Sequence, residues 1–583
     1  MKLEARFMIA ELRRWARSSA LAQVAVAIGI GALAGASVTA MSWAAEAMHV
    51  AFFGIAFDTR LSAAARISPV AAFLTLSIGG LLIGGVEFWR RRRKLPPTVD
   101  PIEANALRGG RLSLRDGLLV VAQTLVSNGC GASVGLEAGY AQIGAALASR
   151  IGVGFKFRRQ DLRMLVGCGA AGAIAAAFAA PLTGACYAFE LIIGAYSLSN
   201  AAPVLAAAVA GALTVKSLGG APYLLHAPPV AALGLEHHLA LVVLGLVAAA
   251  LGVAAMRAAA VVERGFQASR LPIWARPVAG GLVVALFASF TPQALGAGHG
   301  AMGLDIPRAL GALTLASLIV VKLTSCLISL ASGFRGGLFF ASLFVGALLG
   351  KLYALLVAAA LPGLALDPTA CIYAGMGTLG VAIVGGPLTM TFLVLESSGD
   401  LSVAGGVLAA CIASSLAVRI SFGYSFSTWR LHLRGENIRG AQDIGWQREL
   451  TVARLMDRDP AMARAQETLA EFRAAHPLGS AHYVALEDEV GRYAGLVAVP
   501  EAYVEGLTPA RPVHEIARFL EATLAPEMSA REALALFETA QSETLAVVDS
   551  ASFALLGTLG EAYAARRYAE AISLAARGVL DQG

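Results

Sequence analysis

A lone carboxylate, Glu137, is the residue of this sequence whose surroundings most clearly predict chemistry. Glu137 is the one charged residue in the run 131–145. The run 333–347 repeats three of the glycines of the first run with a constant offset, but it has Phe339 in place of the acid. In membrane transporters, internal repeats often place a substrate site where broken helices from the two halves meet. A charged group at membrane depth is costly, and we therefore interpret Glu137 as a functional residue.

The composition is typical of a membrane protein with many spans. Hydrophobic residues make up 57% of the 583 residues and charged residues only 14%, whereas roughly a quarter is usual in soluble domains. The net charge of +6 is small. Its densest run, Arg90–Lys94, follows an apolar segment, as expected for the cytoplasmic flank of a span. We therefore expect an integral membrane protein without a nucleic-acid partner.

The apolar segments fall into two halves. Many of them are short and are interrupted by Gly, Pro or Ser, and such broken helices are tolerated at membrane depth only where protein covers them or a cavity adjoins them. We expect an N-terminal amphipathic helix at residues 1–19 and a transmembrane domain at residues 20–433. This domain would contain two repeats, at about 67–218 and 236–433.

The composition changes at about residue 434. Charged residues become frequent, and residues 434–583 contain no apolar run that could span a bilayer. Short apolar strands, such as 493–499 and 545–548, alternate with helical patterns. This alternation predicts a separate cytoplasmic α/β domain with two related halves.

A second pair of acids also follows the repeat. The stretch 180–183 is echoed by 386–389, and in each a Pro is followed nine residues later by an acid, Glu190 or Glu396. Two interpretations stay open: these acids pack helices together through hydrogen bonds to the backbone, or they take part in transport. The six cysteines lie in or beside apolar segments without a CxxC pair, and we expect them to be buried hydrophobes with no metal site.

Several short motifs follow one another in the order and spacing of a known family. They are Gly135-Leu-Glu-Ala-Gly139, Ala141-Gln-Ile-Gly-Ala145, Ala179-Ala-Pro-Leu-Thr-Gly184, Leu295-Gly-Ala-Gly-His-Gly300, Gly337-Leu-Phe-Phe-Ala341 and the tyrosine of Phe422-Gly-Tyr-Ser-Phe-Ser427. In these motifs the chain resembles the CLC family of chloride channels and chloride/proton exchangers over roughly residues 20–433, and its tail resembles the paired CBS modules of many members. The resemblance implies an all-α polytopic membrane protein with inverted repeats of broken helices, followed by a cytoplasmic α/β CBS pair.

The resemblance also implies roles for individual residues. Glu137 would be the gate and the external proton site. The anion-binding residues would be Thr98, Gly337, Leu338, Phe339, Phe340 and Tyr424. Thr98 belongs to Pro97–Pro101, which replaces the family's Gly-Ser-Gly-Ile-Pro. The family's usual inner acid falls on Leu191, which leaves Glu190 as a possible inner proton route and leaves both the channel and the exchanger open.

An anion that leaves water needs new partners, and helix N-terminal amides carry roughly half a positive charge with unpaired N–H groups. The glycine-rich starts Gly135–Gly139 and Gly337–Ala341 would let the backbone approach the ion. A fixed Lys or Arg would hold the ion too tightly for fast passage, and neither of these two motifs contains a basic residue. Ionised Glu137 would occupy the anion position until a proton or a competing anion displaces it.

The expected ligand is chloride or a similar small anion, with protons as a further partner in an exchanger. The resemblance implies a homodimer in the bacterial inner or plasma membrane with both termini cytoplasmic. No cofactor is expected, because Gly560 and Tyr563 stand where nucleotide-binding CBS sites often carry Thr or Ser and Asp. The alternative is a polytopic membrane enzyme or sensor with a regulatory tail, which would need a nucleophile–base pair or a metal cluster that the sequence does not offer.

Overall fold

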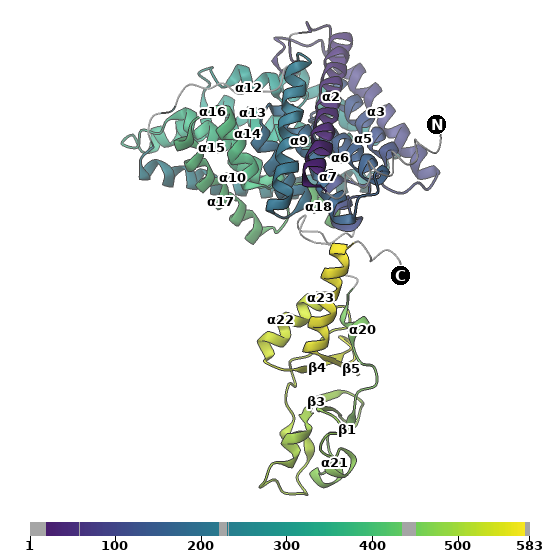
Figure 1. Cartoon of the computed structure of the whole chain (residues 1–583). Coiled ribbons are helices and arrows are strands. Elements are labelled where there is room, and N and C mark those ends of the chain that lie inside the picture. Colours follow the sequence, from purple (N-terminus) through teal and green to yellow (C-terminus); the bar gives the residue numbers. More distant parts are fainter. Residues whose placement is uncertain (1–18, 58, 221–229, 231–232, 434–449, 578–583) are drawn as a thin grey trace, which may run out of the picture. The chain divides into compact units, whose positions relative to one another are not determined.

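The structure, a computed structural model, describes residues 19–57, 59–220, 230, 233–433 and 450–577. The chain divides into two compact units, Met1–Asp443 and Ile444–Gly583, called here the membrane unit and the tail unit and described separately (Figure 1). The expected helix at residues 1–19 lies outside the described residues except for Ser19, and so does the expected boundary at residue 434.

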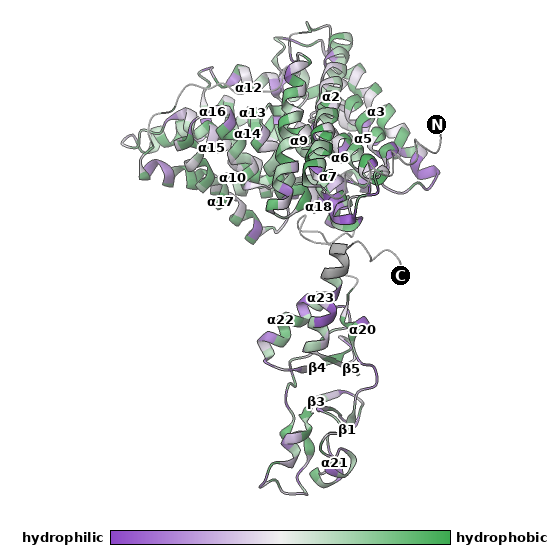
Figure 2. Ribbon diagram, in the orientation of Figure 1, coloured by the Kyte–Doolittle hydropathy of each residue, from purple (hydrophilic) through white to green (hydrophobic). Residues whose placement is uncertain are grey.

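The membrane unit is built of helices. In chain order they are α2 (Ala20–Phe53), α3 (Pro69–Arg92), α4 (Pro101–Leu107), α5 (Leu114–Gly129), α6 (Glu137–Gly154), α7 (Arg159–Phe178), α8 (Pro181–Tyr187), α9 (Leu198–Ser217), α10 (Leu235–Ala268), α11 (Arg276–Phe290), α12 (His299–Asp305), α13 (Ala312–Ser332), α14 (Phe339–Ala360), α15 (Pro368–Val384), α16 (Pro387–Ser398), α17 (Leu401–Ser421) and α18 (Phe426–Leu433). Three short turns complete it: η1 (Leu61–Ala63), the π-helical η2 (Ala188–Ile193) and η3 (Pro292–Ala294). In the described part of the chain, eight helices are long and apolar enough to cross a membrane, and hydrophobic residues cover them (Figure 2). The prediction of an all-α, multi-pass membrane protein is confirmed.

The two repeats are visible in the way the helices pack. α6 packs against α7 as α14 packs against α15. α2 packs against α7 and α9, and in the same way α10 packs against α15 and α17. The first repeat therefore includes α2 and begins before residue 67, where the sequence pattern had placed its start. The long apolar run of α2 carries no motif that shows its correspondence to α10.

Glycine pairs let the helices cross at the same place in both repeats. A Cβ atom built on Gly144 of α6 would lie 2.2 Å from the carbonyl oxygen of Gly169 in α7, and the reverse distance is 2.1 Å. The pair Gly346 and Gly375 joins α14 to α15 with distances of 2.3 and 2.2 Å. At both crossings the two backbones touch, so a larger residue would force the helices apart.

Glu190 and Glu396 each cap a helix of the other repeat. The carboxylate of Glu396 accepts hydrogen bonds at the start of α8 from the backbone N–H of Thr183 (2.9 Å), from its hydroxyl (2.7 Å) and from the preceding amide. The carboxylate of Glu190, in η2, does the same at the start of α16 with Thr389 (2.9 and 2.6 Å) and the amide before it. Carboxylates are favourable at helix N-termini because they satisfy free amides and complement the helix dipole. Both acids thus make the hydrogen bonds to the backbone that the packing interpretation requires.

The tail unit has the predicted α/β fold with two related halves. Its elements are α20 (Val452–Leu455), β1 (Met462–Arg464), α21 (Leu469–Ala475), β2 (Tyr483–Glu487), β3 (Tyr493–Ala498), α22 (Ala530–Ala540), β4 (Thr544–Val548), β5 (Leu555–Gly560) and α23 (Glu561–Arg577). In the first half β1 pairs with β2 in parallel and β2 with β3 in antiparallel, and in the second half β4 and β5 form an antiparallel pair. Capping boxes at Thr468–Glu471 and Ser529–Glu532 start α21 and α22, so both halves begin their helix with the same local chemistry.

The reciprocal caps predict a matched pair of variants. Glu190→Gln and Glu396→Gln should each lower the free energy of unfolding by about 1–3 kcal/mol, because each replaces charge-assisted hydrogen bonds at a helix start by neutral ones. Thermal unfolding of the detergent-solubilised protein, followed by tryptophan fluorescence, measures this. Similar losses in the two variants are expected, and a loss confined to one of them would contradict equivalent caps.

Candidate functional site

The two repeats meet at a short backbone pairing between Gly135 and Gly337. The N–H of Gly135 donates to the carbonyl of Gly337 at 3.0 Å, and the N–H of Gly337 donates to the carbonyl of Gly135 at 3.2 Å. α6 begins two residues after the first glycine, at Glu137, and α14 begins two residues after the second, at Phe339. The sequence alignment of the two halves therefore corresponds to a direct contact in space.

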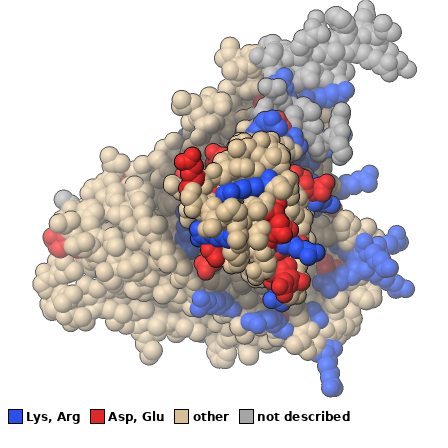
Figure 3. Space-filling view, turned by 90° about the horizontal axis from the view of Figure 1, so that it is seen from below, with Lys and Arg blue, Asp and Glu red and all other residues tan. Residues whose placement is uncertain are grey.

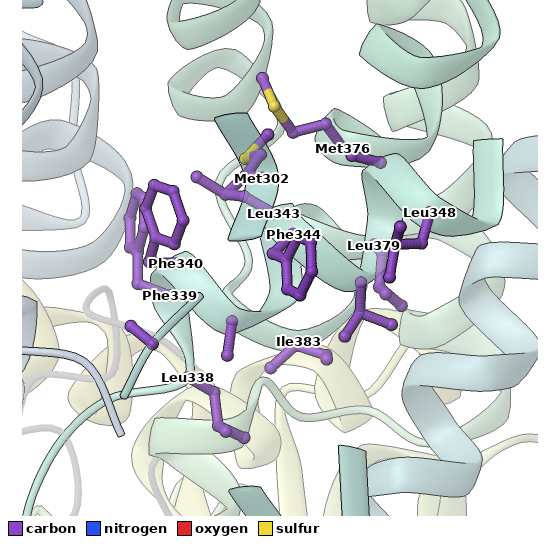
Figure 4. Packing of buried hydrophobic residues seen from close by; sticks show 14 of the residues in the cluster. Met302, Leu338, Phe339, Phe340, Leu343, Phe344, Leu348, Met376, Leu379 and Ile383 are labelled. Carbon is purple, nitrogen blue, oxygen red and sulfur yellow. The ribbon is translucent and has the colours of Figure 1, made fainter. Parts of the chain in front are cut away.

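Two helix N-termini, one from each repeat, are fixed side by side by this pairing. The first N–H groups of an α-helix have no partner within the helix and carry a partial positive charge. Phe339 and Phe340, at the start of α14, belong to the buried cluster drawn in Figure 4, so the protein and not bulk water surrounds this helix start. Such an arrangement can take the place of the hydration shell of a small anion.

Two cavities approach the paired helix starts. The first, of about 360 Å³, is lined among others by Glu46, His49, Arg60, Tyr140 and His299, and we call it the His299 cavity. The second, of about 150 Å³, is lined among others by Thr98, Asp100, Tyr187, Gly337, Leu338, Phe339, Arg335 and Arg430, and we call it the Arg335 cavity. Glu137 lines both cavities. Glu137 is the residue that the two linings share.

The side chain of Glu137 is 3% exposed and folds back over the start of its own helix. A Cβ atom on Gly135 would lie 1.9 Å from Oε2 of Glu137, so glycine is required beneath the carboxyl group. Oε1 is 3.5 Å from Nε2 of His299. Oε2 is buried and has no hydrogen-bond partner among the described residues. Burying a carboxylate oxygen without a partner costs free energy. A side chain that moves away from this place during part of its working cycle does not bear that cost throughout.

The structure brings most of the expected anion-binding residues together. Thr98, Gly337, Leu338 and Phe339 all line the Arg335 cavity. Thr98 belongs to the segment 97–101, which departs from the family's pattern. This segment therefore lies at the site, and a residue with a hydroxyl group lines the cavity. Asp100 in the same segment caps α4 by accepting a hydrogen bond from the backbone N–H two residues on, at 2.8 Å.

Two other expected anion-binding residues, Phe340 and Tyr424, are not among those that line the Arg335 cavity. The ring of Phe340 stacks on His299, with centroids 3.7 Å apart. The ring of Tyr424 packs against Trp429 and His432, and the tyrosine hydroxyl lies 3.3 Å from Nδ1 of His432.

A different tyrosine, Tyr187, lines the Arg335 cavity. It ends α8, and its ring centroid is 6.2 Å from that of Phe339. Sequence reasoning did not find it, although it stands three residues beyond the matched stretch 179–184. The signal that the sequence offered for Tyr187 was a polar aromatic residue on a short helix of the first repeat.

Two basic residues outside the motifs 135–139 and 337–341 lie at the site. Arg335 and Arg430 both line the cavity, and Nη2 of Arg335 is 3.5 Å from Oγ1 of Thr98. Arg335 stands inside the repeated run 333–347, two residues before Gly337. A guanidinium group stays charged at every physiological pH, so it attracts anions into the cavity and holds them more strongly than amides alone.

Glu190, expected as a possible inner proton route, lines neither cavity and uses both carboxylate oxygens as the cap of α16. Its neighbour Leu191 is apolar and does not line them either. In the described residues, the carboxylates that do line the cavities are Glu46, Asp100 and Glu137.

Comparison with known proteins assigns the family. Residues 79–419 match the voltage gated chloride channel family. A ClcB-like chloride channel protein of Ralstonia nicotianae is 31% identical over 61% of this chain and 84% of its own length. The voltage-gated ClC-type chloride channel ClcB of Citrobacter koseri is 28% identical over 68% of this chain and 95% of its own length. The chain belongs to the voltage-gated chloride channel (CLC) family, and this membership does not favour a polytopic enzyme or sensor.

Solved structures share the fold. A slow cyanobacterial Cl⁻/H⁺ antiporter superposes with a TM-score of 0.62 at 22% identity, covering 71% of this chain and 97% of its own. A CLC-type fluoride/proton antiporter gives 0.55 at 20% identity, over 70% and 96%. A eukaryotic CLC transporter gives 0.59 at 16% identity and covers 93% of this chain and 98% of its own, so the likeness extends into the tail.

The position of Arg335 predicts that its charge contributes to anion affinity. Arg335→Gln should weaken chloride binding roughly tenfold, since loss of a nearby fixed charge of this kind costs on the order of 1.4 kcal/mol. Isothermal titration of the purified protein with chloride measures the change. Arg335→Lys is the matched control, because it keeps the charge and should stay within about threefold of the unchanged protein. Equal affinity in all three proteins would show that the guanidinium does not act on the anion.

Proposed function

We propose that the chain carries chloride, or a similar small anion, across the membrane through the two cavities and past Glu137. The observation that carries this proposal is the position of Glu137, which lines both cavities at the meeting point of two helix N-termini. An anion that enters either cavity meets the same pair of helix starts. This arrangement supports transport as the activity, and not catalysis.

Glu137 is the gate in this proposal. Its ionised carboxylate is itself an anion, and it takes the place between the helix starts that chloride would otherwise occupy. A proton removes the charge and with it the attraction to the amides, and a competing anion displaces the carboxylate directly. Thr98 and Tyr187 offer hydroxyl groups, and Arg335 offers a cation, to the anion that replaces it.

We propose that anion flow is coupled to protons weakly or not at all. Glu190 is bound to the start of α16, and Leu191 can neither accept nor release a proton. A specific observation favours the second candidate, exchange of chloride for protons. Asp100 and Tyr187 line the same cavity as Glu137, so titratable groups other than Glu190 lie along the route.

The proposal extends to assembly and placement. We propose a homodimer. Each subunit would contain one pathway, because both helix starts and both cavities are formed within one chain. Exposed Lys and Arg side chains gather on the face of the membrane unit seen in Figure 3. Arg91 and Arg92 end α3, Arg93 and Lys94 follow it, and all four are exposed. By the positive-inside rule, we propose that this end of α3 is cytoplasmic, with both termini on the same side, in the inner or plasma membrane of a bacterium.

We propose that the tail unit works as a CBS pair without a bound nucleotide, and that the protein needs no cofactor. Gly560 ends β5 and Tyr563 lies in the first turn of α23. Neither residue supplies the carboxylate that commonly holds a ribose. The tail then acts through protein contacts and not through ligand sensing.

The gate predicts the behaviour of Glu137→Gln. In liposomes containing the purified protein, anion efflux of this variant should persist, should lose its dependence on pH, and should carry no protons, because glutamine neither ionises nor occupies the site as an anion. Chloride and proton fluxes recorded together, with empty liposomes as the control, measure all three. Wild-type pH dependence in the variant would show that Glu137 is not the gate.

The unchanged protein provides the test of coupling in the same liposomes. A pH gradient should fail to drive chloride against its own gradient if transport is passive. Uphill chloride movement would establish the exchanger, and its loss in Asp100→Asn would assign the route to the Arg335 cavity.

A further inference from the structure

His299 is the titratable neighbour of the gate. It begins α12, and its ring stacks on Phe340 with centroids 3.7 Å apart and 22° between the ring planes. In this orientation Nε2 lies 3.5 Å from Oε1 of Glu137. The imidazole therefore presents an edge nitrogen to the carboxyl group, while its face is held by an aromatic ring from the second repeat.

The backbone around His299 is also fixed. Oγ of Ser62, in η1, accepts hydrogen bonds from the N–H groups of Gly300 (3.0 Å) and Ala301 (3.1 Å), the first turn of α12. η1 and α14 pack against α12. The imidazole is thus held from two sides, and what remains variable at this position is its charge.

Charged groups surround His299 from several elements. Those facing it or its cavity are Glu137 and Tyr140 from α6, Glu46 and His49 from α2, Arg60 beside η1, and Lys322 from α13, with Asp305 and Lys351 at the far end of α12. Glu137 favours the imidazolium form, and Arg60 and Lys322 oppose it. Lys322 itself donates hydrogen bonds to Oγ of Ser133 and to three carbonyl oxygens.

We propose that His299 is a proton-transfer and positioning residue that serves Glu137 from the His299 cavity. This inference rests on the proposed role of Glu137 as the gate. The imidazolium gives the proton on Nε2 to Oε1 of Glu137, which becomes a neutral carboxylic acid, and the neutral imidazole regains a proton from a hydronium ion or buffer acid in the cavity. Before the transfer, the imidazolium attracts the carboxylate and keeps Oε1 within reach of Nε2.

The transfer favours an open path, because neutral Glu137 is no longer attracted to the helix N-terminal amides. Burial lowers the pKa of the His299 imidazole below its ordinary value, Arg60 and Lys322 act in the same direction, and Glu137 acts against them. The charge of His299 therefore changes on the acid side of the usual histidine range. Anion flux should therefore rise as the pH falls through this range, and His299 should set the position of that rise. Without the imidazole, Glu137 depends on direct protonation by water, which needs a lower pH.

The test is the pH profile of anion flux in liposomes for the unchanged full chain, His299→Gln and His49→Gln, with equal pH on both sides from 4.5 to 8. Glutamine keeps a hydrogen-bonding group but does not titrate. In His299→Gln, the rise in flux should move to lower pH by about one unit or more, which is a tenfold change in proton concentration, while the maximal flux stays within about twofold. His49→Gln is the matched control: it removes the other histidine of the cavity, whose Nε2 lies 3.0 Å from the carbonyl of Asn128, and should keep the original profile.

Two further variants separate this inference from the gate itself. Glu137→Gln combined with His299→Gln should behave like Glu137→Gln alone, because His299 acts only through the carboxylate. His299→Asn should repeat the profile of His299→Gln, and size-exclusion chromatography confirms that each variant is folded. A fall in flux by the same factor at every pH would overturn the inference and leave a structural role. A pH-independent Glu137→Gln together with an unchanged profile in His299→Gln would refute the role of His299 while the gate stands.

Discussion

The pairing of Gly135 with Gly337 is the interaction on which the rest of the membrane unit depends. A bilayer offers no water to satisfy backbone N–H and C=O groups, so a helix that breaks at membrane depth must find partners within the protein. The two antiparallel hydrogen bonds satisfy backbone groups of Gly135 and Gly337, which stand two residues before α6 and α14. They also hold the next amides of α6 and α14 together without satisfying them, and an anion or the Glu137 carboxylate can do so instead.

The repeat supports the fold symmetrically and the chemistry asymmetrically. The glycine crossings and the reciprocal caps of Glu190 and Glu396 are the same in both halves. At the site, the constant offset of the repeat pairs Glu137 with Phe339 and Ser133 with Arg335. The acid thus comes from one half and the fixed cation from the other. The repeat provides the same packing contacts in both halves. Differences between the halves, within a few residues of the paired glycines, place the opposite charges of Glu137 and Arg335 in one pathway.

The sequence predicts the features that depend on local pattern. Apolar length and interrupted helices predict the spans, and the offset between the two glycine runs predicts the meeting of α6 and α14. Side-chain direction does not follow from pattern. Tyr424 has the expected sequence neighbours, but its ring packs with Trp429 and His432, and Tyr187 reaches the cavity from a different helix. Arg335 was visible in the repeat, but its orientation toward Thr98 follows from tertiary packing.

In the proposed mechanism, groups in both cavities act on the position of Glu137. Arg335 and Arg430 line one cavity and carry a charge that does not vary with pH, whereas the other cavity is lined by Arg60 and by the titratable His299. A two-state group moves from one position to the other only when something binds one position more strongly, and roughly 5.5 kcal/mol is needed to reverse a 99:1 preference. A proton passed from His299 to Glu137 supplies part of this free energy, because the neutral acid is no longer attracted to the helix amides. An anion held by Arg335 supplies a further part, because it repels a carboxylate from the same space. In this mechanism a proton from one cavity and an anion from the other act on Glu137 in the same direction.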